Sequence, residues 1–273
     1  MLLEKMKDHI IKYRIAYTVL VIMVLLYINY TTKEHKKVVI FDLDETIGYF
    51  QEISMFINAL EEFIQRKITK HEMFHVFDLF PEYFRPYILN CLEALRDYKV
   101  DNPLLKVVIY TNNCGPKEWA INISEYLEMK IKYKIFDHVI GIYQWNNKTV
   151  EKMRTTNEKI IDDLKRIIGS FEPLNAFFVD NLYHEGMKDT YYILCNDYVH
   201  SISFAEMLQR FIRSAPNFIA EENRLNFRKH MVKYFENYKY TKYVRTKADL
   251  DTSLSILKHL KLFLNSSGTG AEL

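Results

Sequence analysis

Short apolar runs recur along the chain, and each of them ends in polar or acidic residues. These runs cover residues 37–41, 106–110, 139–143, 176–179 and 191–195. A short run rich in β-branched and aromatic residues is typical of a strand buried on both faces of a parallel sheet. Because parallel strands end at one edge of a sheet, we expect the polar residues that follow them to form a site there.

Segments with apolar residues at helical spacing separate these runs. They cover residues 53–66, 87–96, 117–129 and 159–168, and Pro86 opens the second of them, since proline suits the first position of a helix. Strands that alternate with helices predict an α/β fold with a parallel sheet flanked by helices.

Two regions lie outside this alternation. A small, partly helical insert of about residues 49–84 follows the first strand, and residues 74–84 within it read as an aromatic-rich connection. Residues 214–265 carry a helical pattern with a basic, tyrosine-rich stretch, which predicts a helical C-terminal appendage to the domain of residues 37–213. The small, polar residues 266–273 are expected to be disordered.

The longest apolar run lies near the N-terminus. Residues 15–28 are almost wholly apolar, with Lys and Arg on both sides. The run reaches the roughly 20 residues of a membrane-spanning helix only if its polar and tyrosine flanks lie at the interfaces. We predict that residues 1–36 form a basic leader and a single transmembrane anchor, with a buried helix as the alternative. The basic flanks leave its orientation open.

Composition and charge limit the classes of function. The 273 residues are 49% hydrophobic and 26% charged, as in a globular protein with a substantial core. A formal net charge of +2 does not by itself indicate nucleic-acid binding. Three cysteines without a CxxC pair favour neither disulfides nor a zinc site, so we expect the domain in a reducing compartment, on the cytosolic or nuclear side. His184 lacks metal-ligand spacing and is expected to be a surface or internally bonded histidine.

Acidic and hydroxyl side chains follow the strands in an order that suits phosphoryl transfer. Asp42 and Asp44 come after the first strand, Thr111 after the second, and Asp180 and Asn181 after the fourth. One carboxylate can attack phosphorus, while a second carboxyl group protonates the leaving group. A hydroxyl, a lysine and oxygen ligands for Mg²⁺ counter the charge of the phosphoryl oxygens.

Four motifs resemble those of the haloacid-dehalogenase (HAD) superfamily, in its CTD-phosphatase-like or NLI-interacting-factor-like branch. They are the DLDET sequence of residues 42–46, Phe84-Arg85-Pro86, Thr111, and Val179-Asp180-Asn181. The resemblance covers roughly residues 38–213. It implies a HAD-like Rossmannoid sheet and a Mg²⁺-dependent phosphomonoesterase that forms a phosphoaspartate.

The resemblance also implies a role for each matched residue. Asp42 would be the nucleophile and Asp44 the acid and base. Mg²⁺ would be held by an Asp42 oxygen, the Asp44 backbone carbonyl and Asn181. Asp180 would orient the lysine of the third motif, for which we select Lys159.

Lys159 is selected over Lys152 and Lys165 because it begins a helix, and a helix start faces the site. Further residues lie where they would meet the phosphate or the rest of the substrate. These candidate substrate-binding residues are Thr46, Arg85, Asn112 and Arg154.

The predicted activity is hydrolysis of phosphoserine or phosphothreonine in a phosphoprotein by a membrane-anchored enzyme. The same DxDxT chemistry in polynucleotide 3′-phosphatases makes a nucleic-acid end the alternative substrate, which would give the basic stretch of residues 229–247 a purpose. A third interpretation is a membrane-anchored interaction scaffold without activity. The intact Asp42, Asp44 and Asn181 argue against it.

Overall fold

The chain divides into two compact units, Met1–Lys36 and Lys37–Leu273. The computed structural model describes residues 13, 17–24, 37–170, 173–214, 218–239 and 241–266. In the first unit residues 17–24 are helical. No helix within the described residues has both the length and the apolar character to cross a bilayer. Residues 15–16 and 25–28 of the predicted anchor, and residues 267–273 of the tail, lie outside the described residues.

The second unit is built on a five-stranded parallel sheet with the order β3-β2-β1-β6-β7. The prediction of an α/β fold with a parallel sheet flanked by helices is therefore confirmed. The chain adds β2 and β3 on one side of β1 and then crosses to add β6 and β7 on the other side. Sheets of this kind bind ligands beyond the strand ends, between the two strands where the order changes direction, here β1 and β6. The strands are β1 (Lys37–Phe41), β2 (Lys106–Tyr110), β3 (His138–Ile140), β6 (Asn175–Asp180) and β7 (Tyr191–Leu194).

A separate antiparallel hairpin follows β3. Its strands β4 (Gln144–Trp145) and β5 (Lys148–Thr149) are joined through Asn146 and Asn147. Both asparagines have a positive φ, of 47° and 61°, which asparagine tolerates better than most residues.

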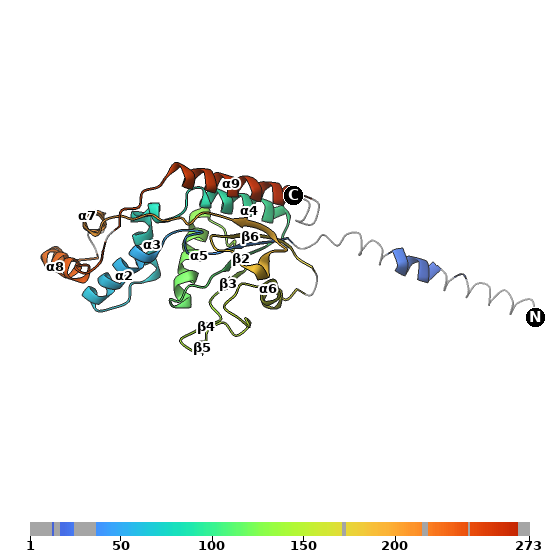
Figure 1. Cartoon of the computed structure of the whole chain (residues 1–273), viewed down its shortest axis with the longest axis horizontal. Helices are drawn as coiled ribbons and strands as arrows, with labels where there is room; N and C mark the ends of the chain where they lie inside the picture. The colour runs from blue at the N-terminus through green and yellow to red at the C-terminus, as the bar shows by residue number, and fades with distance from the viewer. Residues whose placement is uncertain are drawn as a thin grey trace, which may run out of the picture. The chain divides into compact units, whose positions relative to one another are not determined.

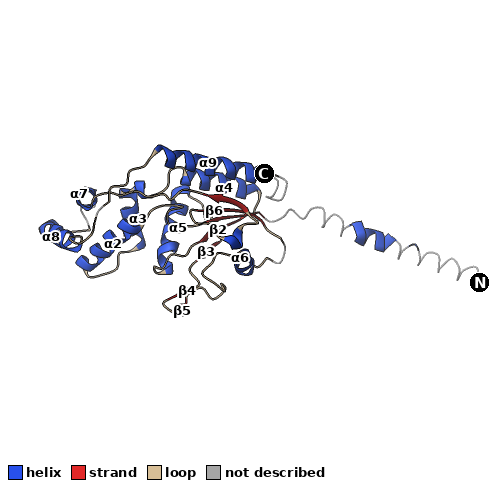
Figure 2. Cartoon of the chain, viewed as in Figure 1, coloured by secondary structure: helices blue, strands red, loops and turns tan. Residues whose placement is uncertain are grey.

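Helices connect the strands and cover both faces of the sheet (Figure 2). They are α2 (Gln51–Ile64), α3 (Lys70–Leu79), α4 (Ile88–Asp101), α5 (Lys117–Ile131), α6 (Ile161–Ile168), α7 (Phe204–Ser214), α8 (Arg224–Tyr234) and α9 (Lys247–Asn265).

The side chains of β1 alternate between two hydrophobic layers. Val38 and Ile40 belong to the layer that α6 covers, whereas Val39 and Phe41 belong to the layer formed with α4, α5 and α9. All four side chains are fully buried. Burial on both faces explains why the strand sequences are almost continuously apolar.

The insert after β1 is more helical than the sequence predicted. The expected helix is α2, but the first part of the expected aromatic connection is the helix α3. Thr69 begins α3 with a capping box: the Glu72 N–H donates to the Thr69 hydroxyl at 3.2 Å, and the Thr69 N–H donates to the Glu72 carboxylate at 2.7 Å. The prediction of a connection over residues 74–84 overlooked this signal, which satisfies the first N–H groups of the helix.

The C-terminal helices share the core of the sheet. Helix α9 lies along α4 (Figure 1), and its Phe263 packs on Phe177 of β6 with ring centroids 5.3 Å apart. Helix α7 packs against α3, and α8 packs against α2. Two residues of α2 also contact these helices: Phe56 meets Phe211 of α7, and Phe63 meets Phe227 of α8. The described part of residues 214–265 is helical in large part, and it completes one hydrophobic core together with the sheet, within the same compact unit.

Candidate active site

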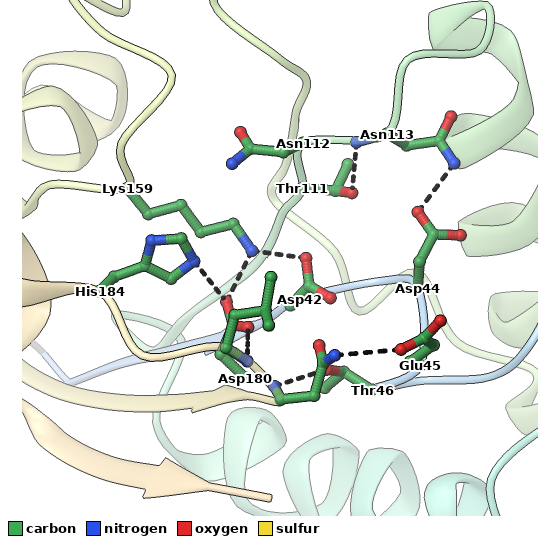
Figure 3. Close-up of polar contacts among 12 residues, drawn as sticks. Asp42, Asp44, Glu45, Thr46, Thr111, Asn112, Asn113, Lys159, Asp180 and His184 are labelled. Atoms are coloured by element: carbon green, nitrogen blue, oxygen red, sulfur yellow. Dashed lines mark hydrogen bonds and ion pairs between the residues drawn. The ribbon is translucent and has the colours of Figure 1, made fainter. Parts of the chain in front are cut away.

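The C-terminal ends of β1, β2 and β6 bring the predicted site residues together (Figure 3). Asp42 follows β1, Thr111 follows β2, and Asp180 ends β6. The Asp42 N–H donates to Val179 O at 2.9 Å, and the register pairs Phe41 with Val179, so the ends of β1 and β6 lie level. Residues that are far apart in the sequence therefore meet at one edge of the sheet, at the reversal of strand order.

Lys159 links two of the aspartates. Its Nζ donates to Asp42 Oδ1 at 2.5 Å and to Asp180 Oδ2 at 2.6 Å. The exposed fractions are 2% for Lys159, 6% for Asp42 and 1% for Asp180, so water screens these charges little. Lys159 reaches the site from the loop that ends at Ile160, immediately before α6. Two carboxylates share one ammonium group.

The two carboxyl groups bonded to Lys159 differ in acidity. Burial raises the pKa of Asp42 to about 6, although the positive charge of Lys159 opposes this shift. Burial acts in the same direction on Asp180, but the contact with His184 at 3.4 Å and the charge of Lys159 outweigh it and lower the pKa of Asp180. Asp180 therefore stays ionised to lower pH than Asp42.

Asp44 turns away from Lys159 toward the end of β2 (Figure 3). Its Oδ2 accepts a hydrogen bond from Asn113 Nδ2 at 2.8 Å. Burial raises the pKa of Asp44, against the effects of the Asn113 hydrogen bond and the Lys159 charge. A carboxyl group with a raised pKa keeps its proton to higher pH, which suits a general acid.

The turn that carries Asp44 depends on a close backbone approach. Glu45 has a φ of 59°, and its N–H donates to Gly48 O at 2.7 Å. A Cβ atom on Gly48 would lie 2.5 Å from Tyr83 O, closer than non-bonded atoms allow. Glycine at this position lets the turn lie against residues 81–84, which precede Arg85.

Thr46 and Asn181 tie this turn to the end of β6. The Thr46 hydroxyl donates to Asn181 Oδ1 at 3.1 Å and accepts from the Asn181 N–H at 3.2 Å. Asn181 Nδ2 donates to Glu45 at 3.3 Å and to Asp197 at 3.1 Å. Thr46 is buried, and the structure places its hydroxyl on Asn181.

The predicted Mg²⁺ ligands form an all-oxygen donor set. The Asn181 amide nitrogen donates to two carboxylates, whereas its oxygen accepts a hydrogen bond from the Thr46 hydroxyl. Asp42 directly precedes the turn that carries Asp44. Within the described residues, no group of three or more His, Cys, Asp or Glu side chains is arranged to hold a metal ion. The predicted set instead mixes a carboxylate, a backbone carbonyl and an amide. Its hard oxygen atoms are the ligand type that suits Mg²⁺.

Arg85, a predicted substrate-binding residue, is bonded to the protein backbone. It is 3% exposed. Its Nε donates to Thr46 O, and its Nη2 donates to Glu45 O and Asn196 O, both at 2.7 Å. A planar guanidinium group with several donors can hold such carbonyl groups in fixed positions. Arg85 thus supports the turn after β1.

Arg154, another predicted substrate-binding residue, holds the loop that leads to Lys159. It is 2% exposed, and its guanidinium lies 4.6 Å from the centroid of the Tyr110 ring. Nη1 donates to Gly141 O at 2.7 Å and to Asn112 Oδ1 at 2.9 Å, and Nη2 donates to Asn157 O at 3.0 Å. The Asn112 amide donates to Asn157 O at 2.9 Å, so Asn112, which was also predicted to bind substrate, belongs to the same hydrogen-bonded group as Arg154.

Two residues that the sequence did not assign to the site contact its aspartates. Asn113 bonds Asp44, and the polar run that follows β2 was the available signal for it. His184 is 6% exposed, with Nε2 3.4 Å from Asp180 Oδ2 and Nδ1 3.0 Å from Glu158. It lies in a loop, where no periodicity marks its position. The expectation of an internally bonded histidine is met, but its place beside Asp180 was missed.

A cleft of 810 Å³ opens beside Asp44. Its walls come from the turn after β1, from α2, and from residues 113–116 with the first turns of α5. Cys114 lies on this wall, and burial together with the negative charge of Asp44 raises the pKa of its thiol. The neutral thiol is therefore favoured, and Cys114 is a poor nucleophile.

Comparisons with known proteins leave the geometry of the site as the basis for a functional argument. The chain matches no protein-family model, no curated protein and no solved structure.

Proposed function

We propose that this chain is a Mg²⁺-dependent phosphomonoesterase of the HAD type that works through a phosphoaspartate on Asp42. The observation that carries the proposal is that two neighbouring carboxyl groups have different partners. Asp42 is held by the buried ammonium group of Lys159, whereas Asp44 turns to Asn113 and lines the cleft. One carboxylate is thus fixed for attack, and the other can exchange protons with a substrate in the cleft.

The reaction has two steps. A carboxylate oxygen of Asp42 attacks phosphorus, the bond from phosphorus to the leaving oxygen breaks, and Asp44 gives its proton to that oxygen. Asp44, now ionised, then takes a proton from water as the water oxygen attacks phosphorus. The bond to Asp42 breaks and inorganic phosphate leaves. The raised pKa of Asp44 supports its role, because the first step requires the protonated form.

The residues around Asp42 counter the charge of the phosphoryl group. The ammonium group of Lys159 is the nearest cation to Asp42, at 2.5 Å. The Thr111 hydroxyl accepts a hydrogen bond from the Asn113 N–H at 3.0 Å, which leaves its own proton for a phosphoryl oxygen. Asp180 orients Lys159, because its carboxylate accepts a hydrogen bond from Nζ at 2.6 Å and its lowered pKa keeps it ionised to low pH.

A divalent cation would complete this charge balance. Asp42, the Asp44 backbone carbonyl and Asn181 would hold it, and their oxygen atoms suit Mg²⁺. When bound, Mg²⁺ neutralises negative charge on the phosphoryl oxygens.

The positions of the motifs on the sheet support the HAD assignment. The sequence DLDET follows the central strand β1, Thr111 follows β2, and Asp180-Asn181 closes β6 on the opposite side of β1. We place the substrate among proteins that carry phosphoserine or phosphothreonine. The open cleft beside Asp44 supports this choice. The phosphorylated side chain of a protein must reach Asp42 while the polypeptide backbone that carries it stays outside the catalytic site. The membrane anchor stays a prediction.

Hydrolysis of a generic aryl phosphate by the full chain tests the proposal. We expect turnover with Mg²⁺, loss of turnover with a chelator, and a decrease of more than about a thousandfold in Asp42→Asn. Asp101→Asn, a change at the exposed end of α4, is the matched control and should retain wild-type turnover. Equal activity in Asp42→Asn would refute Asp42 as the nucleophile. No activity in the folded wild type would refute the phosphatase proposal and leave the scaffold interpretation.

A further inference from the structure

The charged residues that line the cleft beside Asp44 are mainly acidic. Among the described residues that line it, four carry carboxyl groups and one carries an ammonium group. The ammonium group is Lys67, which pairs with Glu61 at 2.7 Å, so its charge is already balanced. Glu45 and Glu118 remain as negative charges, because Asp44 carries a proton in the first step of the proposed reaction. Such a lining repels polyanions and attracts cations.

The uncharged side chains of the cleft suit a polypeptide. Gln51, Ser54 and Asn58 lie on one face of α2, three and four residues apart, and Asn122 comes from α5. Amide side chains both donate and accept hydrogen bonds, as peptide groups do. Trp119, which is partly buried, offers an aromatic surface for an apolar side chain. The volume of 810 Å³ lies within the usual range of ligand sites.

Asp44 belongs both to the proposed catalytic pair and to the cleft. The leaving oxygen must meet Asp44 in the first step of the reaction, so the rest of the leaving group extends from Asp44 along the cleft. We propose, on the basis of the phosphatase function above, that this cleft binds the peptide segment around the phosphorylated residue. Its chemistry selects segments with Lys or Arg next to an apolar residue.

Matched phosphopeptides test this selection. One peptide carries lysines and a leucine beside phosphoserine, a second carries glutamates in place of the lysines, and a 3′-phosphorylated oligonucleotide represents the other class of substrate. We expect kcat/KM for the lysine peptide to exceed that for the glutamate peptide by about tenfold, with the oligonucleotide slowest. Equal values for the two peptides, or a preference for the glutamate peptide or the oligonucleotide, would overturn the inference.

Reversal of one charge in the cleft connects the preference to this surface. In Glu118→Lys the ratio of the two kcat/KM values should fall by about fivefold, because one attractive charge becomes repulsive. Glu62→Lys makes the same change on an exposed residue of α2 outside the cleft lining, and it should leave both the ratio and aryl phosphate turnover unchanged. An equal ratio in the two variants would place the selection elsewhere.

Fluorescence separates this inference from the proposed activity. The chain has 2 Trp, and Trp145 on the hairpin is 47% exposed, so Trp145→Phe leaves Trp119 as the reporter in the cleft. The lysine peptide should change Trp119 emission at concentrations about tenfold below those needed for the glutamate peptide. If the wild type hydrolyses no phosphate ester, the proposed function fails, and this titration still decides the inference. Equal titration curves would then refute it.

Discussion

Removal of the ammonium group of Lys159 should destabilise the fold as well as abolish turnover. Lys159→Met keeps an unbranched side chain of similar length beside the ring of Phe178, from whose centroid the wild-type Nζ lies 5.9 Å. It leaves two buried carboxylates without their shared cation. Removing one partner of a buried ion pair costs about 3–5 kcal/mol, and we expect a loss of this size at pH 8.

The pH dependence of that loss follows from Asp42. Its pKa is raised to about 6 in the folded protein, above its usual 3.8, so stability falls as pH rises through this interval. Loss of the Lys159 charge raises the pKa of Asp42 further, because that charge lowers it in the wild type. The variant should therefore lose more stability than the wild type with rising pH, and the difference between the two should be smaller at pH 5 than at pH 8.

Urea unfolding followed by circular dichroism measures both effects. Lys165→Met, on the following helix α6, is the matched control, and it should change the free energy of unfolding by less than about 0.5 kcal/mol. A loss below about 1 kcal/mol in Lys159→Met, or a loss that does not vary with pH, would refute a buried, doubly bonded ammonium group.

Three further changes test the fold that positions the site. Hydrogen bonds from Arg66 lower the pKa of Glu72 from its usual 4.5 to about 2. The ionised Glu72 therefore stabilises the fold above pH 4.5, and this contribution is lost as pH falls toward 2. Glu72→Gln should flatten this part of the profile of unfolding free energy against pH. Phe263→Ala should cost about 3–5 kcal/mol in urea unfolding, whereas the exposed Leu262→Ala should cost little; equal small losses would contradict the packing of α9. Gly48→Ala should cost about 1–3 kcal/mol and lower aryl phosphate turnover, because its methyl group displaces the turn that carries Asp44; unchanged turnover in this variant would contradict that close approach.

The sheet could be predicted because each strand carries its own signal. The run at residues 106–110 coincides with β2, and that at residues 37–41 coincides with β1. After their first lysine both strands are buried on two faces, so they are apolar from there on and contrast with the polar residues after them. The convergence of Asp42, Thr111 and Asp180 needed only the rule that parallel strands end at one edge.

The remaining features depend on contacts between distant residues. Arg85 meets the carbonyl group of Asn196, and α9 packs on α4; neither pairing leaves a pattern in the local sequence. His184 contacts Asp180 from a loop, which has no periodic spacing to read. By contrast, Thr69 and Glu72 form a local capping signal that the sequence displayed and that would have predicted α3.

The most direct test of the central claim is to find the phosphoryl group on Asp42. The full chain is mixed with Mg²⁺ and an aryl phosphate, quenched in acid during turnover, digested and mapped by mass spectrometry. We predict a phosphoryl group on the peptide that contains Asp42, and its loss in Asp42→Asn. Turnover by the wild type with a phosphoryl group on another residue, or with the group still present in Asp42→Asn, would contradict the account.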